Sequence, residues 1–200
     1  MTGEREDAIE RYERTIDHQI ALLDGIDDKA QKVVQYTGAV LGLVLTAISI
    51  IPRVEGITFG DIPLASQTTL ILGIFALLGA IALGMITYLS SVIEYGLGGE
   101  FGHSVAAGDI ESPVYEEVIL NSYSTTVENN REVINTNAIR FRWTLEALIT
   151  GIALLVLSGL YFLFQVPLLH AVGVAILYSL LLGRLLLYIH REEFLVLDRE

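Results

Sequence analysis

The hydrophobic residues of this chain gather in four long blocks, at residues 33–51, 69–89, 143–164 and 166–189. A helix of about 20 apolar residues rises roughly 30 Å, which is the thickness of the hydrocarbon core of a bilayer. Each block is therefore long enough to cross a membrane. The pattern predicts four transmembrane helices.

The polar segment before the first block has a helical period. Its apolar positions are spaced alternately three and four residues apart, as in the seam of a coiled coil. These positions are Ile9, Tyr12, Ile16, Gln19, Leu23, Ile26, Ala30 and Val33. No helix breaker occurs between Val33 and Ile51, so the pattern predicts one helix that begins as an amphipathic stalk and continues through the first block. We expect it to end at Pro52, which cannot continue the backbone hydrogen-bond ladder.

A second stalk is predicted at residues 114–142, directly before the third block. Its seam positions are Ile119, Tyr123, Val127, Asn130, Ile134, Asn137 and Phe141. The two asparagines would either lie in the seam, where they would fix the register at some cost in stability, or face water. The period leaves both alternatives open. The glycine-rich residues 95–113 before this stalk predict a loop or a short re-entrant excursion.

The predicted fold class is therefore all-α, an integral membrane protein with four transmembrane helices. Two cytoplasmic stalk helices are continuous with its first and third spans. The expected parts are a stalk at 1–32, a transmembrane hairpin at 33–90, a glycine-rich loop with the second stalk at 91–142, a second hairpin at 143–189 and a tail at 190–200.

The distribution of basic residues predicts the orientation. Of the 12 lysines and arginines, Arg53 alone would lie outside if both termini were cytoplasmic. This arrangement satisfies the positive-inside rule. We expect a multi-pass protein of the cell membrane with both termini in the cytoplasm.

Charge and composition narrow the expected partners. The chain has 24 acidic residues and a formal net charge of −12, which argues against a nucleic-acid partner. An acidic surface with only two lysines is typical of a halophile-like composition, since a salt-rich cytoplasm screens self-repulsion. The chain has no cysteine, so it has neither disulfides nor thiolate metal sites.

No pattern of catalytic residues is evident in the sequence. The four histidines, His18, His103, His170 and His190, lack the i, i+4 spacing with a carboxylate that a metal-binding helix needs. No serine has the spacing of a nucleophile elbow, and no glycine run matches a phosphate-binding loop. We expect no enzyme activity, no metal and no cofactor.

Two charged residues lie inside the apolar blocks, Glu146 in the third and Arg184 in the fourth. Ionisable residues within a span usually find a partner, so these two are expected to form an intramembrane ion pair. Two alternatives stay open. Arg142, four residues earlier, could pair with Glu146, and Arg184 could extend to the headgroups alone.

Small residues recur every four positions in the first two blocks. Gly38 and Gly42 form a GxxxG pattern, and Ala76, Ala80 and Gly84 form a second stripe. Such stripes let helix backbones approach closely in lipid. They predict the helix-packing faces and, together with the stalk seam, a homo-oligomer.

Two short stretches carry a resemblance to a known family. "IDDKAQKVV" before the first span and "NTNAIRFRWTLEALITGIALLVLS" entering the third resemble the membrane effectors of Pycsar anti-phage systems and the related SLATT-type effectors. The family's D-x-K-A-like element matches Asp28, Lys29 and Ala30. The family's later helix, which is rich in Asn, Lys and Arg, matches Asn137, Arg140 and Arg142. The resemblance covers roughly residues 20–165.

The resemblance implies antiviral defence by a protein that responds to a cyclic pyrimidine nucleotide and impairs the membrane. The chain differs from this pattern because it has no recognisable nucleotide-binding module, so Arg131, Arg140 and Arg142 would have to supply the positive charge for the anionic ligand. Two other functions remain open, a constitutive membrane scaffold that docks a partner through its stalks and a small-solute channel. The apolar midpoints of the blocks, such as residues 153–155, disfavour the channel.

Overall fold

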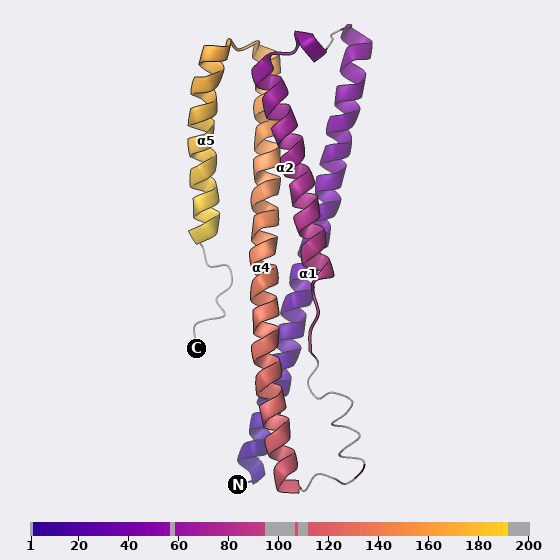
Figure 1. Cartoon of the computed structure of the whole chain (residues 1–200), viewed down its shortest axis with the longest axis vertical. Helices are drawn as coiled ribbons and strands as arrows, with labels where there is room; N and C mark the ends of the chain where they lie inside the picture. The colour runs from indigo at the N-terminus through magenta and orange to yellow at the C-terminus, as the bar shows by residue number, and fades with distance from the viewer. Residues whose placement is uncertain (1, 57–58, 95–106, 108–111, 192–200) are drawn as a thin grey trace. The chain divides into compact units, whose positions relative to one another are not determined.

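Helices are the only regular secondary structure in the described part of the chain. The computed structural model describes residues 2–56, 59–94, 107 and 112–191, and within these ranges it contains no strand. Its long helices are α1 (Thr2–Glu55), α2 (Leu64–Leu89), α4 (Ser112–Phe164) and α5 (Leu168–Arg191), with the short 3-10 helix η1 (Phe59–Asp61) between the first two (Figure 1). The predicted all-α fold class is confirmed for these residues.

Each of the four long helices contains a stretch long and apolar enough to cross a membrane. These stretches lie within Gly3–Ile50, Leu64–Leu89, Val114–Phe164 and Leu169–Leu187. The prediction of four helices of membrane-spanning length and composition is therefore confirmed. The predicted loop at residues 95–113, including His103, falls almost wholly outside the described residues, as do the side chain of His190 and the tail after Arg191.

The prediction that the first helix ends at Pro52 is wrong. α1 continues to Glu55, and Gly56 then has φ 65, the left-handed conformation that commonly follows the last turn of a helix. A proline removes only its own backbone donor, so a helix near its end can continue for one more turn before a glycine stops it. Helix α4 begins at Ser112, and Pro113 lies in its first turn, where a missing N–H disrupts no helical bond.

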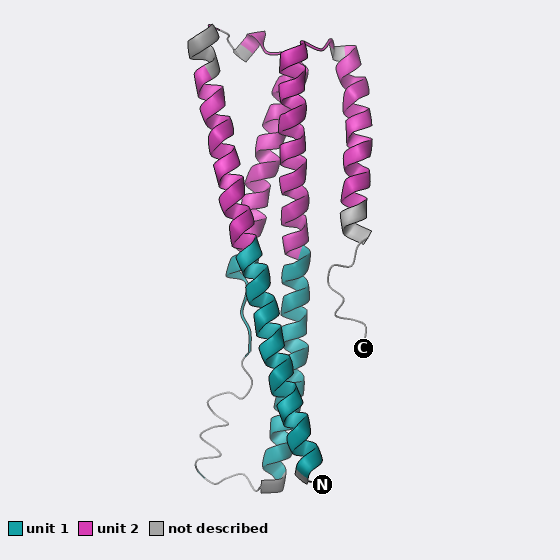
Figure 2. Ribbon diagram, turned by 180° about the vertical axis from the view of Figure 1, so that it is seen from behind, with its two compact units in different colours: residues 1–29, 87–139 teal, residues 30–86, 140–200 magenta. Residues whose placement is uncertain are grey.

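The chain divides into two compact units (Figure 2). Unit 1 contains residues 1–29 and 87–139, and unit 2 contains residues 30–86 and 140–200. Helices α1 and α4 each contribute residues to both units. The division falls close to the borders that the sequence predicted between stalks and apolar blocks.

In unit 1, the amino-terminal part of α1 lies along the amino-terminal part of α4 (Figure 2). The buried side chains of α1 are the predicted seam residues Ile16, Gln19, Leu23 and Ile26. Those of α4 are Ile119, Thr126, Asn130, Ile134, Asn137 and Ala138. Both asparagines are thus interior, which excludes the alternative in which they face water.

In unit 2, glycines bring α2 close to its neighbours. A Cβ on Gly84 would lie 2.6 Å from Cγ2 of Val34, and a Cβ on Gly151 of α4 would lie 2.6 Å from Cδ2 of Leu77. Both distances are shorter than real Cβ contacts, so only glycine allows these backbones to approach so closely. Ser158 on α4 donates to the carbonyl of Ser66 on α2 at 2.8 Å, which adds a hydrogen bond between α2 and α4.

Candidate functional site

The irregular segment that follows α2, residues 90–94, is held in unit 1 by asparagines of α4. The side-chain amide of Asn130 donates to the carbonyl oxygen of Glu94 at 2.9 Å and accepts from the Glu94 backbone N–H at 3.0 Å. An amide can satisfy both backbone groups of one residue in this way, as a neighbouring β-strand would. Asn129 adds a third bond from its amide to Oε2 of the Glu94 side chain.

Two turns further along α4, Asn137 binds the start of the same segment. Its Oδ1 accepts from the hydroxyl of Ser90 at 2.9 Å, and its Nδ2 donates to the hydroxyl of Ser91 at 3.1 Å. Ser91 in turn donates to Oδ1 of Asp27 on α1 at 2.6 Å. We call these residues, Asp27, Ser90, Ser91, Glu94, Asn130 and Asn137, the asparagine cluster. It joins α1, α4 and the segment after α2.

The environment of Asp27 opposes its charge. Burial raises the pKa of this carboxyl above its usual value of 3.8, the hydrogen bond from Ser91 lowers it, and the neighbouring carboxylates of Asp24 and Asp28 raise it. Burial is the largest of these effects because water is partly removed from the carboxylate. The pKa of Asp27 is therefore higher in the folded chain than that of an ordinary aspartate.

Gln19 is a second polar group in the interior of unit 1. Its Nε2 donates to the carbonyl of Val127 at 2.9 Å, whereas its buried Oε1 has no hydrogen-bond partner among the described residues. An unsatisfied buried acceptor costs roughly 1–3 kcal/mol. The interior of unit 1 is thus less stable than an apolar seam of the same length would be.

The residues of the family-like motif have different environments. Asp28 and Lys29 are exposed, while Ala30 is fully buried. The hydrogen-bonded carboxylate at this place is Asp27, one residue earlier. The motif therefore adjoins the asparagine cluster without supplying its polar groups.

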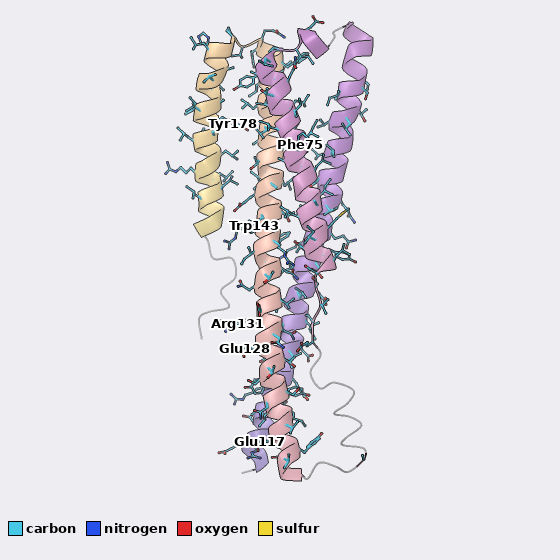
Figure 3. All side chains as sticks on the ribbon, in the orientation of Figure 1. Phe75, Glu117, Glu128, Arg131, Trp143 and Tyr178 are labelled. Carbon is cyan, nitrogen blue, oxygen red and sulfur yellow. The ribbon has the colours of Figure 1, made fainter. Side chains whose placement is uncertain are left out.

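The three arginines proposed as ligand contacts are divided between the two units. Arg131 is exposed in unit 1. Figure 3 labels it on α4 next to Glu128. Arg140 and Arg142 belong to unit 2, where both are half-buried. All three take part in interactions with other residues.

The structure does not bring Glu146 and Arg184 together. Glu146 is half-buried on α4 and has an interaction partner, whereas Arg184 is exposed on α5. No ion pair joins Arg184 to any residue that the structure describes.

The two small-residue stripes also differ. Ala80 and Gly84 are buried between helices of unit 2, and Ala76 is half-buried. Gly38 and Gly42 are exposed, and a Cβ on either would meet no atom within 4 Å. The GxxxG face of α1 is therefore left uncovered by the described part of the chain.

Sequence reasoning missed Asp27, Ser90, Ser91 and Glu94, because none of them stands out by period or motif. It also missed Gly151, although a glycine at the centre of an apolar block is a signal for close helix contact. Among the described residues, no group of three histidine or carboxylate side chains could hold a metal ion.

The chain matches no protein-family model, no curated protein and no solved structure.

Proposed function

We propose that this protein is a non-enzymatic multipass membrane effector in which unit 2 crosses the bilayer and unit 1 is a cytoplasmic switch. The observation that carries the proposal is the asparagine cluster. It holds the segment after α2 with polar contacts in an interior that apolar residues would stabilise better. Buried polar residues of this kind select one packing at the expense of stability.

The exposed apolar side chains of unit 2 support its place in lipid. Leu43 on α1, Phe75 on α2 and Leu163 on α4 are 71%, 67% and 73% exposed. Exposed apolar surface on this scale is unfavourable in water and is expected against acyl chains. With both termini and the stalks cytoplasmic, the positive-inside rule is satisfied.

The switch would act through three connections. α1 and α4 contribute residues to both units, and the segment held by the asparagine cluster follows directly on α2. A change of packing in unit 1 would therefore be transmitted along three of the four long helices. A ligand drives such a change only if it binds one packing better than the other.

The family resemblance suggests a cyclic pyrimidine nucleotide as this ligand and impairment of the membrane as the output, in defence against phage. Arg131 is the basic residue of unit 1 nearest to the cluster in sequence and is the contact we propose for the nucleotide phosphate. The exposed Gly38 and Gly42 face would assemble copies of the chain in the membrane.

Reconstitution of the full chain in dye-loaded liposomes tests the proposal. Cyclic CMP or cyclic UMP should release dye from liposomes that contain the wild type. Gly38→Ile should abolish release. Gly79→Ile serves as the matched control, because a Cβ added to this glycine of α2 would also meet no atom within 4 Å. Absence of both dye release and nucleotide binding would reject the effector and leave the alternative of a scaffold that docks a partner.

A further inference from the structure

Helices α4 and α5 of unit 2 are joined by two tyrosine hydrogen bonds. Tyr161 donates to the carbonyl of Ala171 at 2.7 Å, close to the turn between the helices. Tyr178 donates to the carbonyl of Ala153 at 3.0 Å, two turns further along α5. These bonds fix the pairing of the two antiparallel helices near the turn.

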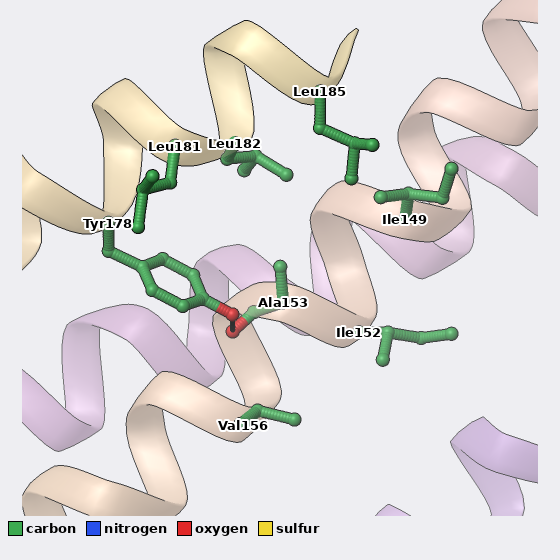
Figure 4. Close-up of a pocket in the computed structure, with 8 residues that line it drawn as sticks. All are labelled: Ile149, Ile152, Ala153, Val156, Tyr178, Leu181, Leu182 and Leu185. Carbon is green, nitrogen blue, oxygen red and sulfur yellow. Dashed lines mark hydrogen bonds between the residues drawn. The ribbon is translucent and has the colours of Figure 1, made fainter. Parts of the chain in front are cut away.

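Between the two helices lies an apolar groove at and beyond Tyr178 (Figure 4). Its volume is about 380 Å³, and Ile149, Ile152 and Val156 face Leu181, Leu182 and Leu185 across it. The only polar side-chain atom of the lining is the hydroxyl of Tyr178, whose proton is already used in the bond to Ala153. The groove therefore suits an apolar occupant.

The size of the groove fits part of one acyl chain. A group the size of a water molecule takes about 30 Å³ of liquid volume, so the volume of the groove corresponds to about a dozen such groups. Because the lining side chains come from two helices that we place in the bilayer, acyl chains are the apolar molecules at highest concentration beside it.

A basic residue stands next to a lining residue of the groove in the sequence. Arg184 directly precedes the lining residue Leu185, is exposed, and pairs with no residue that the structure describes. A charged side chain inside an apolar span costs several kcal/mol unless it finds an anion or reaches the headgroups. A lipid phosphate is an anion and lies in the headgroup region, so it would meet both requirements of the arginine.

The depth of the groove agrees with this assignment. Trp143 is 50% exposed on α4, six residues before Ile149, and exposed tryptophans gather at the headgroup level of membranes. Six residues of helix correspond to about 9 Å. This end of the groove is therefore close enough to the interface for a long arginine side chain to meet a phosphate while the acyl chain enters the groove.

We propose that the α4–α5 groove binds one acyl chain of an anionic phospholipid whose phosphate pairs with Arg184. The proposal rests on the membrane location proposed above, but it needs neither the nucleotide nor the switch.

Native mass spectrometry of the full chain in detergent tests the site. The chain is mixed with equal amounts of phosphatidylglycerol and phosphatidylcholine of identical acyl chains. The wild type should retain the anionic lipid several-fold more than the neutral one. Arg184→Gln should reduce this ratio to about one, Arg184→Lys should keep part of it, and Arg14→Gln, far from the groove in sequence, should leave it unchanged.

A second variant tests the apolar part of the site. Ile152→Trp places a bulky side chain in the groove and should reduce the retention of both lipids, with the helical circular dichroism unchanged. Equal retention of the two lipids by the wild type, or an unchanged preference in Arg184→Gln, would overturn the proposal. An Ile152→Trp variant that keeps both lipids but changes its mass in light scattering would show instead that a second copy of the chain occupies the groove. These measurements contain no nucleotide, so their outcome is independent of the dye-release assay.

Discussion

Replacing Asn137 by alanine removes the centre of the asparagine cluster. The side chain is 1% exposed and bonds to both Ser90 and Ser91. Asn135, on the same helix two residues earlier, is exposed and makes no contact in the cluster. Asn135→Ala is therefore a matched control, because both substitutions raise the intrinsic helix propensity by the same amount.

The expected loss of stability follows from the two hydrogen bonds. Each contributes about 0.5–1.5 kcal/mol net, so Asn137→Ala should be about 1–3 kcal/mol less stable than Asn135→Ala. Without Asn137, the hydroxyl of Ser90 can donate to the carbonyl of Thr87 at 3.3 Å and that of Ser91 still donates to Asp27, so neither hydroxyl loses every partner.

Thermal unfolding of the full chain in detergent, followed by the helical circular dichroism signal, measures this difference. For a chain of this size, each kcal/mol shifts Tm by about 2–4 °C, so the gap between the two variants should be roughly 2–12 °C. Hydrogen exchange should also quicken at the Glu94 amide in Asn130→Ala, because that N–H donates to Asn130. Equal Tm values for Asn137→Ala and Asn135→Ala would refute the role of the cluster in holding unit 1 together.

Three further outcomes follow from the same geometry. Because the pKa of Asp27 is raised in the folded chain, the contribution of its protonated form to stability is full below the ordinary pKa of 3.8 and is lost as pH rises through the folded pKa. The Tm advantage of the uncharged Asp27→Asn over the wild type should therefore grow as pH rises from below 3.8 to neutrality, and an advantage independent of pH would contradict this. Gly84→Ala should cost about 1–3 kcal/mol, since its Cβ would lie 2.6 Å from a valine methyl group, while Gly79→Ala has room; equal stability of the two by denaturant titration would reject the close packing. Single cysteines at Gly56 and at the exposed Ser124 should be labelled by an impermeant reagent from outside and from inside, respectively, and the reverse pattern would overturn the orientation.

The helices and their buried faces could be predicted because the signals are local. The three-and-four spacing in α1 identified Ile16, Leu23 and Ile26 as interior residues, and these side chains are buried. A helix turns by a constant angle per residue, so a periodic apolar pattern defines one face whatever covers it. The end of α1 was predicted less well, since the effect of Pro52 depends on how much helix remains beyond it.

The asparagine cluster could not be predicted from the sequence, for a different reason. The period placed Asn130 and Asn137 on the seam, but their partners, Ser90, Ser91 and Glu94, are more than 30 residues away and have no period of their own. A side-chain amide can form hydrogen bonds equally well with a facing helix, with water or with an extended segment. Only the fold selects among these.

Composition and periodicity determined that this chain is helical, that four of its stretches can span a bilayer, and which faces of its stalks are interior. The tertiary structure decided which partner each face meets. Gly38 and Gly84 both belong to small-residue stripes, yet only Gly84 is packed against neighbouring helices. A small residue permits close approach without specifying what approaches, so the sequence marks the contact surface and the three-dimensional arrangement of the helices determines its use.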